Sequence, residues 1–178
     1  MCKLARAPRS KVLKAEADYG YCAAKDEHYY GLKANLLIDL RGVVVGLTLT
    51  AGNVDERDSA YDILQAIEGL LFGDKGYIRP QLKADCAALG IDLQTPLRKN
   101  MTERRPRWWL RLLRRLRKRI ETVISQLEQR FGFAKTRARD VWHLTNPITR
   151  KILAHTLGVW LNIQQGREPL ELDSLATA

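Results

Sequence analysis

The sequence predicts an α/β fold in which helices flank a mixed sheet, part antiparallel and part parallel. Three observations support this. The chain has 178 residues, of which 46% are apolar, so one domain with a real core is within reach. Two β-rich runs flank a short polar turn near residue 40. After that turn, short apolar runs alternate with stretches of helical periodicity, as in α/β proteins.

The first predicted elements lie between residues 28 and 74. Strands over 29–38 and 43–50 flank residues 39–42, whose Asp and Gly suit a tight turn. Asp55 is a predicted N-cap, because apolar residues recur at helical spacing after it. A short buried strand then ends at Asp74.

The second half of the chain is predicted to be mostly helical. A short helix opens near Pro80 and closes at Gly90, followed by a strand that starts at Ile91. Two amphipathic helices follow. We expect them over 108–131 and 146–165, and we expect an irregular segment at 1–27, a domain over 28–165 and a tail at 166–178.

Positive charge is concentrated in residues 97–119, which we call the basic segment. It holds 11 Lys/Arg and one Glu, so 11 − 1 = +10, which equals the net charge of the whole chain. Such a stripe indicates a polyphosphate partner, although a solvated helix face or a membrane-surface helix has the same composition. Trp108 and Trp109 lie in this segment, where they could stack on bases or serve as core or interface anchors.

Other features argue against secretion and membrane insertion. No apolar run reaches the ~18 residues that span a bilayer, and the N-terminus has no apolar signal region. The three cysteines are odd in number and form no metal-type spacing, which predicts a reduced cytoplasmic protein. The isolated residues His28, His143 and His155 are expected to be structural or surface residues. Trp142 and Trp160 are expected in the core or at helix contacts.

Two carboxylates are candidates for chemistry. Asp74, in "LLFGDKGY", stands at the end of a predicted strand, where ligands bind in open α/β sheets, although Asp-Lys-Gly is also good turn chemistry. Glu121 follows Arg117 by four residues and Arg114 by seven, so the three share one helix face. An exposed ion pair and a carboxylate beside phosphate-binding guanidinium groups both fit that spacing.

Three motifs together resemble the DDE-type transposases of bacterial insertion sequences. They are "YYGLKANLLIDLRGVVVGLTLTAGNVDERD", "GDKGY" and "KRIETVISQLEQRFG", over roughly residues 28–160. The resemblance implies an RNase H-like fold in which Asp74 and Glu121 are the second and third acids of a catalytic triad. These acids would bind two divalent ions, Mg²⁺ or Mn²⁺, for DNA cleavage and strand transfer at transposon ends. Arg117 would match the arginine of the family's Tyr-Arg-Glu-Lys signature.

The resemblance also implies partners and a location. DNA, at transposon ends and at the target, would be the partner, with no membrane. The full-length form would be a homo-oligomer in the bacterial cytoplasm, associated with the nucleoid. We expect the DNA-binding residues to be Asn53, Arg104, Arg105, Arg107, Arg111, Arg114, Arg115, Arg117, Lys118 and Arg119.

The sequence departs from the family at three positions. The signature's tyrosine and lysine positions hold Arg114 and Glu128. The family's first aspartate would precede the hairpin, and Asp18, Asp26 and Asp39 lie in polar or turn surroundings that do not suit it. We therefore expect an N-terminally truncated chain with the first strand missing or incomplete and with little or no catalysis. The alternative is a nucleic-acid-binding protein without catalysis that acts through the basic helix 104–119.

Overall fold

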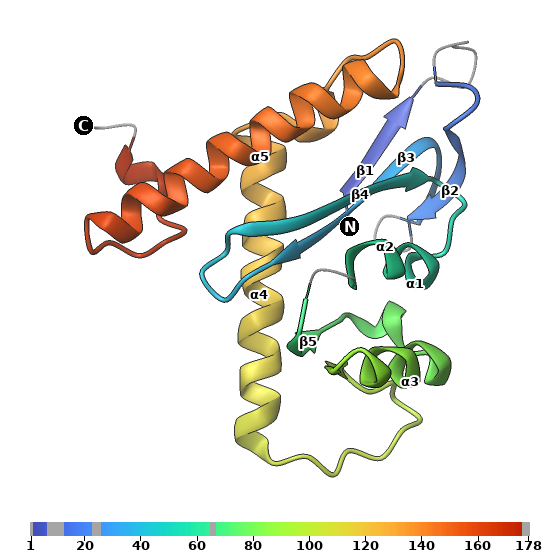
Figure 1. Ribbon diagram of the computed structural model, residues 1–178, viewed down its shortest axis with the longest axis vertical. Helices are drawn as coiled ribbons and strands as arrows, with labels where there is room; N and C mark the ends of the chain where they lie inside the picture. The colour runs from blue at the N-terminus through green and yellow to red at the C-terminus, as the bar shows by residue number, and fades with distance from the viewer. Residues whose placement is uncertain (1, 7–12, 23–25, 65–66, 176–178) are drawn as a thin grey trace. The chain divides into compact units, whose positions relative to one another are not determined.

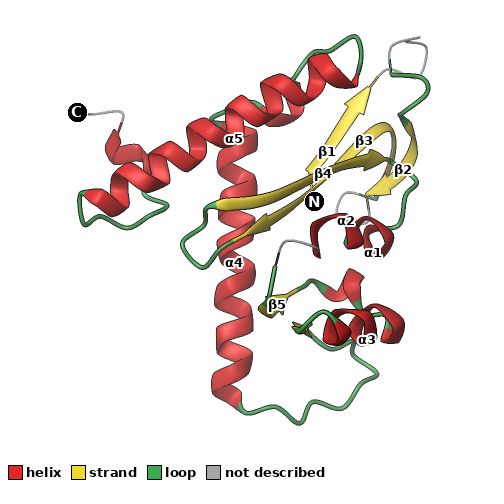
Figure 2. Cartoon of the chain, in the orientation of Figure 1, coloured by secondary structure: helices red, strands yellow, loops and turns green. Residues whose placement is uncertain are grey.

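The computed structural model describes residues 2–6, 13–22, 26–64 and 67–175 (Figures 1 and 2). The chain divides into two compact units, which we describe separately. Unit 1 comprises Met1–Val54 and Glu121–Ala178, and unit 2 comprises Asp55–Ile120. This division does not test the domain boundaries predicted from the sequence, which stay a prediction.

Unit 1 contains an antiparallel sheet built around the long strand β3 (Glu27–Ile38). Strand β1 (Cys2–Arg6) pairs with one edge of β3. Strands β2 (Asp18–Cys22) and β4 (Val44–Ala51) share the other edge and lie end to end, because they pair with successive stretches of β3. The strands β3 and β4 form the predicted hairpin. Its turn is closed by Asp39, whose carboxylate accepts the backbone N–H groups of Arg41 and Val43.

The described part of residues 1–27, which we predicted to be irregular, includes strands β1 and β2. Each strand has only five residues, too few for the alternation of apolar and polar residues to stand out. Leu4 in β1 is nevertheless completely buried. Tertiary packing therefore fixes a strand that the local pattern does not reveal.

The core of unit 1 lies between one face of this sheet and two helices. Alternate residues of β3, among them Leu32 and Ala34, point to the same side of the sheet as Leu4. They meet Val123 and Leu127 from the last turns of α4 (Arg107–Gln129), along with residues of α5 (Val141–Gln164). Two short 3₁₀ helices, η2 (Phe133–Lys135) and η3 (Leu172–Leu175), complete the unit.

Helix α5 begins five residues earlier than the sequence predicted. Asp140 caps it, because its carboxylate accepts the backbone N–H of His143 at 2.8 Å. Pro147 lies inside the helix, where it removes one backbone hydrogen bond. Of the two places expected for Trp142 and Trp160, the core or helix contacts, the core is wrong, because they are 73% and 51% exposed.

Unit 2 holds a parallel pair of strands, β5 (Gly69–Phe72) and β6 (Ile91–Gln94), connected through α3 (Pro80–Ala88). Leu82 and Cys86 of α3 pack against Ile91 and Leu93. The predicted helix after Asp55 is present as two single turns, α1 (Glu56–Ser59) and α2 (Tyr61–Leu64). Asp55 caps α1 as predicted, through a hydrogen bond from the Arg57 N–H.

The architecture is mixed α/β, as predicted, but the described strands form two sheets rather than one. The four antiparallel strands belong to one sheet, and β5 pairs with β6 in a second sheet. Strand patterns in a sequence show which segments are extended, and they do not show which strands become neighbours. The single mixed sheet is therefore not present among the described residues.

Candidate active site and nucleic-acid interface

Asp74 stands in a tight turn after β5. A Cβ atom on Gly73 would lie 3.1 Å from the Cβ of Tyr77, so the absence of a side chain lets Tyr77 fold back over the turn. Asp74 caps the 3₁₀ helix η1 (Lys75–Tyr77), and its Oδ1 accepts the Lys75 N–H at 2.7 Å. The turn chemistry anticipated from Asp-Lys-Gly is thus present, and it fixes the position of the carboxylate.

Asp74 also forms an ion pair with Arg117 of α4. Arg117 Nη1 lies 3.4 Å from Asp74 Oδ1, and both side chains are about half exposed, at 48% and 56%. An exposed pair of this kind contributes between 0 and about 1 kcal/mol to stability. Within the described part of the chain, Asp74 makes no hydrogen bond through Oδ2, which leaves that oxygen available as a ligand.

Negative charge gathers around Tyr77 next to this turn. Burial raises the pKa of Tyr77, and the nearby carboxylates of Glu56, Asp74 and Asp55 raise it further, so the hydroxyl stays protonated. Asp55 stays ionised, because a hydrogen bond from Arg57 lowers its pKa well below the usual range. Arginines lie beside two of these carboxylates, because Arg117 pairs with Asp74 and Arg57 pairs with Asp55.

Glu121 is exposed on α4, one helical turn after Arg117. The helix crosses the division between the units: Arg117 belongs to unit 2 and Glu121 is the first residue of the second part of unit 1. Pairing of Glu121 with Asp74 at one site stays a prediction.

Most of the predicted DNA-binding cations lie on the surface. Six of them are exposed on α4, and Arg104 is exposed just before it, whereas Arg119 is partly buried. A rise of 1.5 Å and a turn of 100° per residue spread these side chains over about half of the helix circumference. The six residues on α4 are Arg107, Arg111, Arg114, Arg115, Arg117 and Lys118.

Arg105 differs from its neighbours because its donors are engaged within the chain. Its Nε and Nη2 lie 2.8 and 2.7 Å from the Glu103 carboxylate, and its Nη1 donates to the Thr95 carbonyl at 3.0 Å. The hydrogen bonds from Arg105 lower the pKa of Glu103 to about 2. Arg105 therefore ties the start of α4 to the end of β6.

Asn53, the remaining predicted DNA contact, lies in the loop after β4. Its Nδ2 donates to Asp18 Oδ2 at 2.7 Å. Gly52 and Gly20 let these segments meet, since a Cβ on Gly52 would lie 2.6 Å from the Asp18 carbonyl oxygen. We did not predict the role of Asp18 as a partner of Asn53, although Tyr19 and Tyr21 after it are a weak strand signal.

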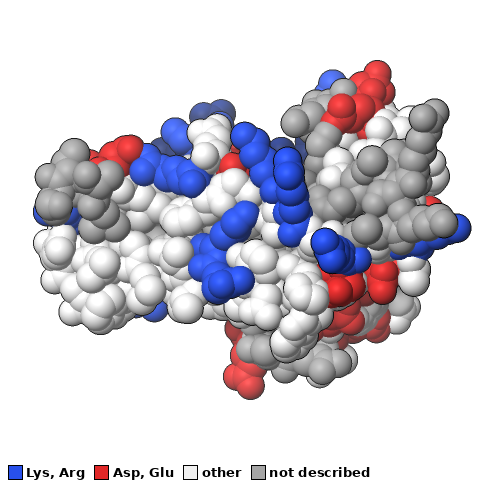
Figure 3. Space-filling model, turned by 90° about the horizontal axis from the view of Figure 1, so that it is seen from above, with Lys and Arg blue, Asp and Glu red and all other residues white. Residues whose placement is uncertain are grey.

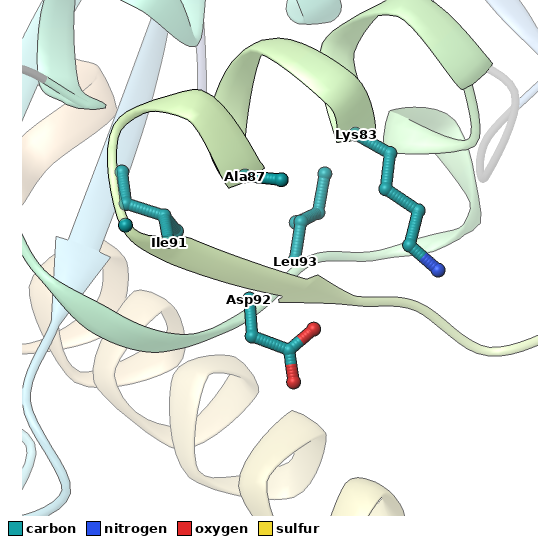
Figure 4. A pocket seen from close by; sticks show the side chains of 6 residues that line it. Lys83, Ala87, Ile91, Asp92 and Leu93 are labelled. Atoms are coloured by element: carbon teal, nitrogen blue, oxygen red, sulfur yellow. The ribbon is translucent and has the colours of Figure 1, made fainter.

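A pocket of about 270 Å³ lies in unit 2 beside α3 and β6 (Figure 4). Lys83 extends from α3 and Asp92 from β6 at its rim, and none of the predicted site residues lines it. The candidate site is therefore the exposed Asp74 turn and the adjoining surface of α4.

The chemistry of this site suits a hard divalent cation that keeps several waters. No group of three or more His, Cys, Asp or Glu side chains in the described residues is arranged to hold a metal by itself. Mg²⁺ commonly uses one or two carboxylates together with water and substrate phosphate oxygens. The free oxygen of Asp74 fits that donor set. Among the described residues, no helix is long and apolar enough to cross a membrane.

Comparison with known proteins identifies the family. The family model described as "Transposase DDE domain" matches residues 1–141, so the chain belongs to the transposase DDE domain family. Membership supports DNA transposase function and implies DNA as the substrate, and the family generally uses divalent metal ions. No curated protein and no solved structure matched the chain.

Proposed function

We propose that the chain is part of the RNase H-like catalytic domain of a bacterial insertion-sequence transposase, in which Asp74 and Glu121 bind divalent ions at a DNA phosphodiester. The ion pair between Asp74 and Arg117 carries this proposal. It ties the acid of the "GDKGY" turn to the arginine that precedes Glu121 by one helical turn. A guanidinium at that position can also bind phosphate oxygens in a bidentate fashion.

Each residue has a distinct role in the proposed reaction. Asp74 supplies a carboxylate oxygen from a turn fixed by Gly73 and Tyr77, and Glu121 supplies one from α4. Arg117 binds a phosphate oxygen and offsets the charge of the substrate. Two bound Mg²⁺ or Mn²⁺ ions would supply activation of a water or 3′-hydroxyl and stabilisation of the leaving oxygen of an in-line displacement at transposon ends.

Metal binding tests these two ligands directly. We expect Asp74→Asn and Glu121→Gln each to weaken Mn²⁺ binding by at least about tenfold in titration calorimetry with duplex DNA present. Asn at position 74 can still accept the Lys75 N–H, so the turn is kept. Asp92→Asn is the control, since Asp92 is an exposed carboxylate of the same unit as Asp74. Equal weakening by the control, or wild-type affinity in both variants, would overturn the assignment.

We also propose that the 178-residue chain, assayed alone, has weak or no catalysis. We assign only two of the three acids of the family reaction to residues of this sequence, and loss of one ligand weakens the binding of both ions. A supercoiled-plasmid nicking assay with Mg²⁺ or Mn²⁺ measures this. Robust nicking that Asp74→Ala abolishes would show that the chain completes its own site.

The second candidate function is nucleic-acid binding without catalysis, through the basic helix 104–119. The exposed cations of α4 favour it. In that case duplex binding would show a steep salt dependence while Mn²⁺ affinity would be unaffected by Asp74→Asn and Glu121→Gln. The first proposal instead requires that both the metal and DNA bind.

We propose further that the full-length form is a homo-oligomer, that its DNA partners are transposon ends and target, and that it acts at the bacterial nucleoid in the cytoplasm. Self-association is supported by α5, whose outer face exposes Leu153, Leu157, Trp160 and Leu161 by 41–55%. Residues 152–166 contain no Asp, Glu, Lys or Arg. Figure 3 shows a largely uncharged surface over that end of α5.

A second copy of the chain is the partner that suits this face. The apolar residues recur at i, i+4, i+7 and i+8, so two copies can pack their stripes together without opposing like charges. We expect Leu157→Glu to lower the mass measured by light scattering during size exclusion, and Thr149→Glu on the same helix to leave it unchanged. A wild-type mass equal to one chain at all concentrations would refute self-association.

A further inference from the structure

Trp108 is exposed at the start of α4 and has no role in the proposed catalytic site. Its side chain is 60% exposed. Its ring packs edge-to-face on Trp109, with centroids 5.4 Å apart and planes at 84°. Trp109 in turn lies 5.7 Å from Phe72, the last residue of β5. Trp109 and Phe72 thus connect the exposed indole to a strand, and the contact with Trp109 limits the orientations available to it.

The surroundings of Trp108 on α4 are basic. At 100° per residue, Arg111 and Arg115 lie within about 60° of Trp108 around the helix axis. Arg117 lies about 180° away, and about 14 Å along the axis. Trp108 and Arg117 therefore mark the two borders of the exposed arc of α4 within unit 2. The cations between these borders are Arg107, Arg111, Arg114, Arg115 and Lys118.

We propose that Trp108 is a stacking site for an unpaired base of the DNA, with the arc between Trp108 and Arg117 binding the phosphates of the same strand. This inference rests on the proposed function, since DNA is the ligand of both. It adds a separate subsite for single-stranded nucleotides. The borders are about 14 Å apart along the axis and on opposite sides of the helix, so a strand that reaches both also follows half of the circumference and spans more than four base steps of 3.4 Å.

The chemistry favours an unpaired base over a paired one. An indole gains stacking energy from the face of a base, and in a duplex those faces are covered by the neighbouring base pairs. Stacking tolerates any base, because every base has a π-face, while exposed guanidinium groups supply the contacts to the backbone. A ring packed against Trp109, which itself packs on Phe72, also loses less conformational freedom when it binds.

The test compares duplex DNA with the same duplex carrying a four-nucleotide single-stranded overhang, using fluorescence anisotropy on the full chain. Trp108→Ala should weaken binding of the overhang DNA by about tenfold, within the five- to hundredfold range of single base stacks. Its affinity for the blunt duplex should stay within twofold. Trp108→Phe should keep most of the overhang affinity. Trp142→Ala, which removes an even more exposed indole outside the basic arc, should change neither.

An overhang of abasic nucleotides supplies the second readout. It keeps the phosphates and lacks the bases, so wild type and Trp108→Ala should bind it equally. The inference is overturned if Trp108→Ala weakens blunt and overhang DNA to the same extent, if it changes neither, or if Trp142→Ala matches it. Failure of wild type to bind any of these DNAs would refute the DNA-binding function itself, so the two failures are distinguishable.

Discussion

Arg104 and Arg105 are adjacent arginines, and they differ in their surroundings in the structure. Arg104 is exposed and free to contact phosphate, whereas Arg105 binds Glu103, Gln94 and the Thr95 carbonyl within unit 2. We predict that Arg105→Ala destabilises the chain with little change in DNA affinity per folded molecule. Arg104→Ala should lower the DNA affinity and leave the stability of the chain unchanged. Substituting both positions singly therefore separates stability from binding.

The magnitude follows from the contacts of Arg105. Its side chain is 22% exposed, and removing the guanidinium takes away the hydrogen bond to the Thr95 carbonyl and the one to Gln94. Net contributions of about 1 kcal/mol per partly buried hydrogen bond give a loss of about 1–2 kcal/mol. For a chain of this size, that corresponds to a Tm lower by about 2–8 °C.

The ion pair with Glu103 makes part of the effect depend on pH. The pKa of Glu103 is lowered to about 2 in the folded chain, chiefly by hydrogen bonds from Arg105. A lowered carboxyl pKa contributes stability that is present above the unfolded value near 4.5 and is lost as pH falls toward 2. The difference in unfolding free energy between wild type and Arg105→Ala should therefore shrink between pH 5 and pH 3.

Urea denaturation followed by circular dichroism measures the stability of both variants, and anisotropy titration with duplex DNA at several salt concentrations measures binding. Arg104→Ala should keep the denaturation midpoint of wild type within error. It should reduce the magnitude of the slope of log K for DNA binding against log salt concentration by about one. Equal loss of stability in both variants would refute the assignment of Arg105. A reduced salt slope in Arg105→Ala with unchanged stability would show that its guanidinium reaches DNA.

Two further predictions concern Gly52 and His155 of unit 1, and Gly76 of unit 2 serves as the control for the first. Gly52→Ala should lower the unfolding free energy by about 2 kcal/mol in urea denaturation, because the new Cβ would lie 2.6 Å from the Asp18 carbonyl oxygen. Gly76→Ala, whose Cβ would meet only the Glu56 carboxylate at 3.2 Å, should cost clearly less, and equal losses would contradict the steric reasoning. His155 is buried, with Nε2 3.0 Å from Gln126 Oε1 and Nδ1 without a partner among the described residues, and burial lowers its pKa. Below about pH 6.5 the unfolded chain binds a proton at His155, and the folded chain resists it. The unfolding free energy should therefore fall on acidification, by at most about 1.4 kcal/mol per pH unit. His155→Gln should reduce this dependence of the unfolding free energy on pH between pH 7.5 and 5.5.

The elements that the sequence predicted well are those with strong local signals. The hairpin of β3 and β4 has two β-rich runs and a turn, α3 has Pro80 and Gly90 at its ends, and α4 has a long apolar stripe. Strands β1 and β2 lack such signals. Their positions depend on pairing with β3, which is a non-local interaction.

The candidate site shows the same limit. The position of Asp74 after a strand was predictable from an apolar run followed by turn residues. The shared helix face of Glu121 and Arg117 was predictable from their spacing, whereas the catalytic role of Glu121 was implied only by the family resemblance. The hydrogen bonds of Arg105 were not predictable, because Glu103, Gln94 and Thr95 come together around it only after β6 and the loop before α4 have folded. Charge in a sequence gives the number of cations, and tertiary structure decides which of them remain free.

The same reasoning applies to α4 as a whole, and a detached peptide would test it. A peptide of residues 104–119 keeps the charge of the helix and loses the support of Phe72 behind Trp109 and the partnership of Asp74 with Arg117. We expect it to bind DNA with a steep salt dependence, because the electrostatic part of the binding free energy needs only cations. It should show little preference for overhang over blunt DNA, since its indole is no longer held in one orientation. A peptide that matched the full chain in this preference would mean that the surrounding fold does not contribute to base stacking.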